Sequence, residues 1–214
     1  TINFTDYDED KVDLRNFKNL LIREVWESGA DVRLNTSCKK EIIEQVSPDA
    51  VIIAVGAHPA VPPIPGIENA MNALEAYEHM DKIGKNVALA GGGLVGCEVG
   101  LHLASHGHKV TVIEMQDMMA KETFAYYRNA LLDEMDKRQV VQMLNTRVLE
   151  FTDIGIAVDL GGDRQMVEAD TCIYSMGMNP DAAAVDEIRA MAENIKTYVI
   201  GDCHKRSEER RVGK

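Results

Sequence analysis

Residues 86–98 read Asn-Val-Ala-Leu-Ala-Gly-Gly-Gly-Leu-Val-Gly-Cys-Glu, and this stretch decides the fold class. An apolar run ends in three glycines, and a helix-like segment follows them. Gly91, Gly93 and Gly96 fit the G-x-G-x-x-G spacing. In such a turn the glycines allow a tight exit from a strand, a close approach of phosphate to the backbone, and close packing of helix on strand. The stretch therefore predicts the first strand, turn and helix of a Rossmann-type unit.

The next residues continue this unit as a dinucleotide-binding domain requires. We expect a helix over residues 95–106 and a second strand over 109–114, which ends in Glu114. An acid at this place can accept hydrogen bonds from both hydroxyls of the adenine ribose. It would also repel a 2′-phosphate, and no arginine follows it closely, so the pattern favours NADH over NADPH. The alternative is a glycine-rich turn without a ligand, which the complete strand–turn–helix–strand–acid unit disfavours.

The unpaired N–H groups at the start of the predicted helix would face the phosphates of the dinucleotide. Glu98 follows the last glycine of the motif, and its position leaves two roles open: it complements the helix dipole, or it contacts the nicotinamide end. The predicted contacts of NADH are Gly91, Gly92, Gly93, Leu94, Val95, Gly96, Glu98, Glu114 and Met115.

The rest of the chain alternates between helical and extended patterns. Five of the six prolines fall in residues 48–66, which we interpret as the crossing between two domains. We expect helices over 10–27, 39–46 and 122–137, single strands over 31–34, 50–55, 140–144, 171–175 and 198–200, and antiparallel strands within 146–168 that turn at 161–162.

A second signal consists of strand-like runs that end in glycine, within residues 51–59, 173–180 and 199–202. Backbone at a strand end that carries no Cβ can approach a flavin nucleotide, and an aspartate there can accept a hydrogen bond from a ribityl hydroxyl. The predicted flavin contacts are Ala54, Val55, Gly56, Gly177, Gly201 and Asp202.

Together these pieces resemble the flavoprotein reductases that have two dinucleotide-binding domains. Residues 54–65, 91–98, 110–115 and 201–203 look most like the C-terminal half of the NADH:flavin oxidoreductase, 2,4-dienoyl-CoA reductase and enoate reductase type. The resemblance implies an α/β fold with a Rossmann-type NAD(H)-binding domain inserted in a partial FAD-binding domain. It also implies that a hydride passes from NADH to FAD and feeds the reduction of an unsaturated substrate.

The resemblance sets the expected domain limits and what lies outside them. The FAD glycine motif of the family would precede residue 1, so we expect a fragment with an incomplete FAD site that is not active alone. Members of this type carry an N-terminal barrel with FMN and a 4Fe-4S cluster, which we expect only in a missing part of the same chain. The expected segments are 1–69 and 179–205 for the FAD-binding domain, 70–178 for the NAD(H)-binding domain, and 206–214 for a non-native tail.

Composition excludes several classes of function. The net charge of −12 argues against a nucleic-acid partner, and the sequence has no apolar run that could cross a membrane. Four cysteines without a C-x-x-C motif argue against a redox dithiol and favour the cytoplasm. Cys97 lies at a helix start that could lower its pKa, although packing is the expected role. His102 and His106 have a spacing that can chelate a metal, but no third ligand is placed clearly, so we predict no metal site.

Two other functions stay open from the sequence. One is an NADH-dependent reductase of a small electron-carrier protein, and the other is a non-catalytic NAD(H)-binding module. In the favoured interpretation the cofactors carry the chemistry, so we name no catalytic side chain. The terminal substrate would be recognised elsewhere in the full-length protein.

Overall fold

A computed structural model describes residues 2–204, and the contacts within it divide the chain into two compact units. The first unit consists of Thr1–Ile22 and Val61–Met176, and the second of Arg23–Ala60 and Gly177–Lys214. Residues 2–22 and 61–69, which we expected in the FAD-binding domain, therefore pack with the first unit. The predicted non-native tail at 206–214 lies outside the described residues.

The first unit is built on a five-stranded sheet with the strand order β3-β10-β4-β5-β6. All its pairings are parallel, so the carboxyl ends of the strands share one edge of the sheet. The predicted α/β class is confirmed, and four of the five strands lie where the sequence indicated; β3 was not predicted. The strands are β3 (Ala70–Asn72), β4 (Asn86–Ala90), β5 (Lys109–Ile113), β6 (Val141–Met143) and β10 (Thr171–Tyr174).

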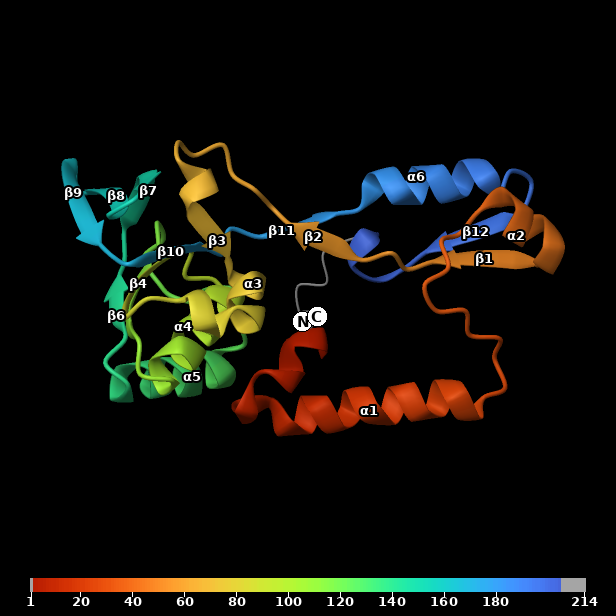
Figure 1. Ribbon diagram of the computed structural model, residues 1–214, viewed down its shortest axis with the longest axis horizontal. Helices are drawn as coiled ribbons and strands as arrows, with labels where there is room; N and C mark the ends of the chain where they lie inside the picture. Colours follow the sequence, from red (N-terminus) through yellow and green to blue (C-terminus); the bar gives the residue numbers. More distant parts are fainter. Residues whose placement is uncertain (1, 205–214) are drawn as a thin grey trace. The chain divides into compact units, whose positions relative to one another are not determined.

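Helices α3 (Ala73–Glu78), α4 (Leu94–Ser105) and α5 (Ala125–Lys137) cover one face of this sheet (Figure 1). Buried side chains of the central strands pack against them, with Leu89 and Leu103 both fully buried. The two longer helices match the predicted ones, although α5 begins three residues later than expected. The sequence prediction missed α3.

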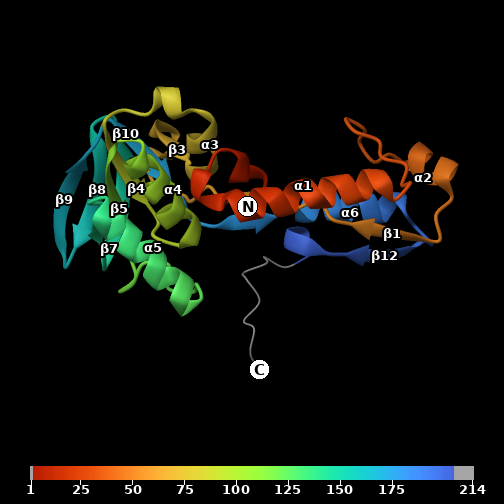
Figure 2. The ribbon, with the colours of Figure 1, turned by 90° about the horizontal axis from the view of Figure 1, so that it is seen from below.

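An antiparallel sheet of β7 (Thr146–Thr152), β8 (Gly155–Leu160) and β9 (Asp163–Glu168) covers the opposite face. Figure 2 shows these strands on the side of the parallel sheet away from α4. The predicted turn at Gly161 and Gly162 is confirmed, and both glycines have positive φ. The first unit thus has three layers: helices, a parallel sheet and an antiparallel sheet.

The second unit has a much smaller core. β1 (Ala50–Ile53) pairs in parallel with β12 (Lys196–Val199), and α6 (Ala182–Met191) packs on them through a cluster with three buried residues, Ile53, Val185 and Cys203. The remaining regular elements are β2 (Ala57–Pro59), which pairs antiparallel with β11 (Met178–Pro180), and the helix α2 (Lys40–Val46).

The predicted strand at 31–34 is wrong. These residues form no strand, and the side chain of Leu34 is 69% exposed. A strand needs a neighbour to satisfy its backbone groups, and no described strand pairs with this segment. The side chains of Asp31 and Arg33 form an ion pair with each other instead.

Helix α1 (Val12–Glu27) is present where the sequence predicted it, and its residues continue from the first unit into the second. None of its side chains is buried, including the apolar stripe of Leu14, Phe17, Leu21 and Val25. No helix within residues 2–204 has the length and apolarity to cross a bilayer. Short 3-10 helices occupy Ile2–Asp6, Glu9–Lys11, Ile67–Asn69, Met80–Lys82 and Gly201–Cys203.

Candidate dinucleotide-binding site

The glycine loop follows the carboxyl end of β4, and neighbouring backbone atoms leave no room for a side chain at two of its glycines. Gly91 has a φ of +107°, and a Cβ there would lie 2.2 Å from the carbonyl oxygen of Ser175. A Cβ on Gly96 would lie 1.9 Å from the carbonyl oxygen of Gly91. These distances are shorter than any real Cβ contact, so larger residues would force the strand, loop and helix apart.

Gly93 differs from its neighbours because no packing requires it to be glycine. It is exposed, its extended backbone has a φ of −66°, and a Cβ there would meet nothing within 4 Å. It is also the N-cap of α4, where the positive end of the helix dipole favours an anion. The open space above Gly93 is what a pyrophosphate would use to approach the backbone.

Gly92 is held by its neighbours at both its N–H and its carbonyl. The carboxylate of Glu114 accepts a hydrogen bond from the N–H of Gly92 over 2.7 Å. The N–H of Ala120 donates to the carbonyl of Gly92 over 2.7 Å, and the thiol of Cys97 donates to the same oxygen over 3.3 Å. Buried hydrogen bonds therefore hold both backbone polar groups of Gly92.

Glu114 lies directly after β5, at the edge of the sheet where the glycine loop lies, as the sequence predicted. Its side chain is buried, and its second carboxylate oxygen accepts a hydrogen bond from the N–H of Gln116 over 2.8 Å. Met115 is 70% exposed beside it, whereas Met119 is buried and lies beneath Gly92. The acid, Met115 and the loop thus lie at one end of the sheet.

Cys97 is a packing residue rather than a reactive thiol. Its side chain is fully buried, and burial raises the pKa of the thiol to about 12. The hypothesis of a lowered pKa at the helix start is therefore wrong, because desolvation outweighs the helix dipole.

Glu98 lies in the second turn of α4, because the helix begins at Leu94. A dipole role is therefore weaker than expected, since the dipole acts mainly within the first turn. Its carboxylate is instead bound by the ammonium of Lys11 over 2.5 Å and by the phenol of Tyr127 over 2.7 Å. Sequence reasoning missed Lys11 and Tyr127, because no motif links these distant segments.

In the second unit, most of the predicted flavin contacts come together. β1 and β12 run parallel, and the N–H of Ile200 donates to the carbonyl of Ile53 over 2.9 Å. This places residues 54–56 beside Gly201 and Asp202 at the carboxyl ends of the two strands. Additional Cβ atoms at Gly56 and Gly201 would meet nothing within 4 Å.

Gly177 lies apart from that group. Its carbonyl accepts a hydrogen bond from the N–H of Ala60, whereas the carbonyl of Gly56 accepts one from Asp181. These two bonds are at opposite ends of the antiparallel β2–β11 ladder. The structure therefore does not bring Gly177 to the other predicted flavin contacts.

His102 in α4 and His106, the C-cap residue of that helix, pack against each other. The ring of His102 is buried and lies 4.9 Å from the ring of Tyr77 and 4.4 Å from that of His106. Within residues 2–204 no group of three or more side chains has the arrangement of a metal site.

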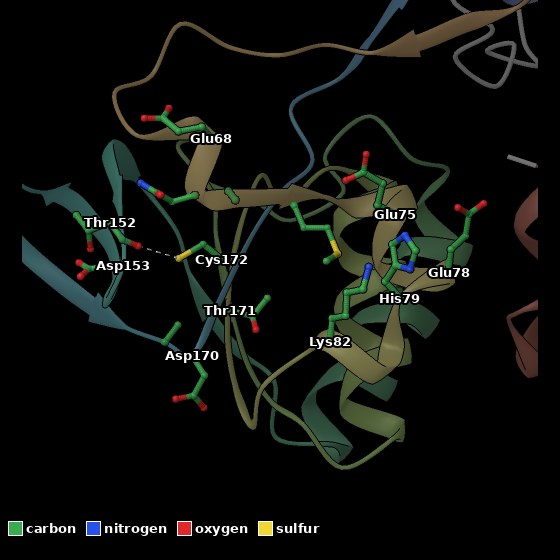
Figure 3. A pocket seen from close by; sticks show the side chains of 14 residues that line it. Glu68, Glu75, Glu78, His79, Lys82, Thr152, Asp153, Asp170, Thr171 and Cys172 are labelled. Atoms are coloured by element: carbon green, nitrogen blue, oxygen red, sulfur yellow. Dashed lines mark hydrogen bonds between the residues drawn. The ribbon is translucent and has the colours of Figure 1, made fainter.

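A hollow of about 610 Å³ lies at the other end of the sheet (Figure 3). Its walls include Thr171 at the start of β10 and Ala70 at the start of β3, whereas the glycine loop follows the end of β4. Because the strands are parallel, this hollow and the glycine loop are at opposite edges, so the hollow is not the dinucleotide site. Its ionisable side chains are Glu68, Glu75, Glu78, His79, Lys82, Asp153 and Asp170.

The sequence profile of the pyridine nucleotide-disulphide oxidoreductases matches residues 13–212. The chain belongs to this family. The family consists of flavoprotein oxidoreductases that use a pyridine nucleotide, so the expected resemblance to flavoprotein reductases is confirmed.

Three curated relatives represent the match. The chain is 25% identical to a cinnamate reductase of Clostridium sporogenes over 83% of this chain and 27% of the relative. It is 28% identical to a bilirubin reductase of Mediterraneibacter gnavus over 97% of this chain and 32% of the relative. It is 30% identical to an NADH oxidase of Thermoanaerobacter brockii over 91% of this chain and 31% of the relative.

A solved 2-naphthoyl-CoA reductase has the same fold, with a TM-score of 0.87 and 24% identity over 96% of this chain and 31% of that one. The chain thus spans 27% to 32% of the lengths of these relatives.

Proposed function

We propose that the first unit binds NADH at the glycine loop and delivers its hydride to FAD bound with the help of the second unit. The observation that carries this proposal is the open space at Gly93, beside a loop whose other glycines serve internal packing. In a Rossmann loop, an N-cap glycine that packing within the protein does not require leaves space for a pyrophosphate. Family membership supports the pairing of a nicotinamide and a flavin cofactor.

NADH rather than NADPH fits the adenosine end of this site. The buried carboxylate of Glu114 would accept the ribose hydroxyls and repel a 2′-phosphate. Met115 and Gln116 follow it, and neither can pair with a phosphate as an arginine would. Met115 is exposed at the place where the adenosine half would lie.

The second unit would supply only part of the FAD site. Residues 54–56, Gly201 and Asp202 would face the cofactor at the carboxyl ends of β1 and β12, where ligands bind in parallel sheets. A parallel pair of strands with three buried core residues is too small to be stable alone, so we propose that further polypeptide completes this domain. We also propose that FMN and a 4Fe-4S cluster bind in that further polypeptide.

The complete protein would use the electrons to reduce an unsaturated compound. Two of the relatives are named cinnamate reductase and bilirubin reductase, and both names denote the reduction of unsaturated molecules. We place the protein in the cytoplasm, because the four cysteines are free thiols.

Calorimetric titration of the chain with NADH and NADPH tests the proposal. We expect micromolar binding that favours NADH, and a loss of at least about tenfold in affinity in Gly93→Val, whose side chain would occupy the phosphate position. Because a Cβ at residue 93 meets no protein atom, the thermal unfolding of this variant should stay close to that of the wild type. A folded wild type that binds neither nucleotide, or an unchanged affinity in Gly93→Val, would contradict the proposal.

A further inference from the structure

We propose that Glu114 is a positioning residue that sets the conformation of the glycine loop before any nucleotide binds. By holding the loop, its carboxylate would help to bind the phosphates, and it would also bind the ribose directly. The inference about the phosphates rests on the proposed function, whereas the inference about the loop does not.

Both carboxylate oxygens of Glu114 are already engaged by the protein. One accepts from the N–H of Gly92 over 2.7 Å, and the other from the N–H of Gln116 over 2.8 Å. Hydrogen bonds to a charged acceptor are about twice as strong as neutral ones, and the side chain is only 7% exposed. Each carboxylate oxygen keeps a second lone pair, so a ribose hydroxyl can still bind.

The backbone of Glu114 is fixed as well, so the side chain acts from a rigid base. Its N–H donates to the carbonyl of Met143 over 2.8 Å, and its carbonyl accepts from the N–H of Thr146 over 2.9 Å. The carboxylate therefore holds Gly92 in a fixed position relative to the end of β5.

The hydrogen bonds to the N–H and the carbonyl of Gly92 fix the direction of the N–H groups that follow it. With its N–H bound to Glu114 and its carbonyl bound to Ala120 and Cys97, the Gly92 residue cannot rotate without breaking buried bonds. The chain then enters α4 at Gly93, whose N–H and those of the first helical turn have no intrahelical acceptor. These are the groups that would bind a pyrophosphate, so a loop that is already ordered would reduce the entropic cost of binding.

Amide hydrogen exchange in the nucleotide-free chain tests the role in the loop. The probes are the N–H groups of Cys97, bound to the carbonyl of Gly93 over 3.0 Å, and of Ala120, bound to the carbonyl of Gly92, because neither donates to Glu114. In Glu114→Gln we expect both to exchange about tenfold faster or more, since one charged hydrogen bond is lost. Glu122→Gln, an exposed acid in the following segment, removes the same charge and should leave both rates unchanged.

Binding of NADH and of reduced nicotinamide mononucleotide, which has a phosphate but no adenosine, tests the role toward phosphate. We expect Glu114→Gln to weaken reduced nicotinamide mononucleotide by about tenfold, and NADH by a larger factor because NADH also loses the hydrogen bonds to its adenosine ribose. A weaker affinity for NADH, with unchanged affinity for reduced nicotinamide mononucleotide and unchanged exchange at both probes, would show that Glu114 acts only on the ribose. This result would overturn the inference. If the wild type binds neither ligand, the proposed function fails, and the exchange rates alone decide the role in the loop.

The wild-type chain gives a measurement that does not depend on the folding of a variant. The N–H of Gly92 should be protected from exchange without nucleotide, and NADH should change its rate little. Exchange of this amide at the rate of an unstructured peptide in the nucleotide-free chain would overturn the inference.

Discussion

The ammonium group of Lys11 lies 2.5 Å from the carboxylate of Glu98, although 87 residues separate them. The side chains of Lys11 and Glu98 are only 15% and 13% exposed. Asp8 lies 3.6 Å from the same ammonium and accepts a hydrogen bond from the phenol of Tyr77 over 3.4 Å. These partly buried charges join residues 8–11 to helices α3 and α4 within the first unit.

Replacement of Lys11 by methionine should destabilise the first unit. Methionine keeps the length of the side chain but leaves the Glu98 carboxylate without its cation, so we expect the free energy of unfolding to fall by about 1 to 3 kcal/mol. Lys121→Met breaks an exposed pair with Asp117 and should cost much less, because water screens exposed charges. Urea unfolding measures both variants, and equal losses would show that burial adds nothing to the Lys11–Glu98 pair.

His102 should make the first unit less stable in acid. Burial lowers the pKa of His102 below 6.5, as does the nearby His106, while Asp8 and Asp10 oppose this shift and Lys11 adds to it. Well above pH 6.5 the ring is neutral in both the folded and the unfolded chain, and it contributes no pH dependence there. As the pH falls below that value, the unfolded chain binds a proton that the folded chain does not, so the free energy of unfolding decreases.

Unfolding of the wild type and of His102→Gln at a series of pH values isolates this contribution. The variant should lose stability less steeply between pH 6.5 and the lowered pKa. His58→Gln, at an exposed histidine, serves as the control substitution. Parallel curves for the wild type and His102→Gln would mean that His102 does not resist protonation.

The parts of the fold that the sequence predicted well are those with a strong local pattern. Within about 30 residues, the sequence combines glycines that steric constraints require with a clear apolar periodicity, over the glycine loop, β4, α4 and Glu114. Such local patterns predict structure because they depend little on the rest of the chain. Helix α3 was missed although Asn72 and Glu75 form a capping box at its start, a signal that the sequence does contain. Helix α6 was missed although the side chain of Asp181 caps it.

Contacts between segments far apart in the chain could not be predicted from one sequence. Lys11 is an ordinary surface lysine by pattern, and only the packing of η2 (Glu9–Lys11) on α4 brings it to Glu98. The same holds for the strand expected at 31–34: alternating apolar residues fitted a strand, but whether a neighbouring strand exists is decided elsewhere in the chain. The buried hydrogen bond that the N–H of Gly92 donates to Glu114 is another contact that the motif alone did not indicate.

Ala120 should tolerate glycine unusually well. It is buried beside the loop with a φ of +45°, a conformation that costs a residue with a Cβ about 1 to 2 kcal/mol. Ala120→Gly removes this strain, which offsets the greater chain entropy of glycine, so the free energy of unfolding should change by less than about 1 kcal/mol in either direction. Ala120→Val should be strongly destabilising, because a β-branched residue does not fit positive φ.

Ala76 provides the matched comparison, since it is a buried alanine in the regular helix α3. Ala76→Gly should lower the free energy of unfolding by about 1 kcal/mol, because glycine is unfavourable inside a helix. If glycine costs as much at 120 as at 76, the positive φ of Ala120 carries no strain.

The four cysteines should react with iodoacetamide in an order set by burial. Cys38 is exposed, whereas Cys97, Cys172 and Cys203 are buried, and burial raises the pKa of Cys172 to about 11 as well as that of Cys97. The thiolate is the reactive form, so the folded chain should be alkylated at Cys38 first. Mass spectrometry after digestion identifies the labelled residues, and the Cys38→Ser variant should show almost no early labelling.

Among the buried thiols, Cys203 should be labelled before Cys97. Cys203 belongs to a cluster with three buried residues in the second unit, whereas Cys97 belongs to the large core under α4. A small core opens at a lower free energy, and alkylation of a buried thiol requires such opening. Addition of NADH should slow the labelling of Cys97, whose thiol bonds to the glycine loop, and leave that of Cys38 unchanged. Simultaneous labelling of Cys97 and Cys203 would instead mean that the two units unfold as one.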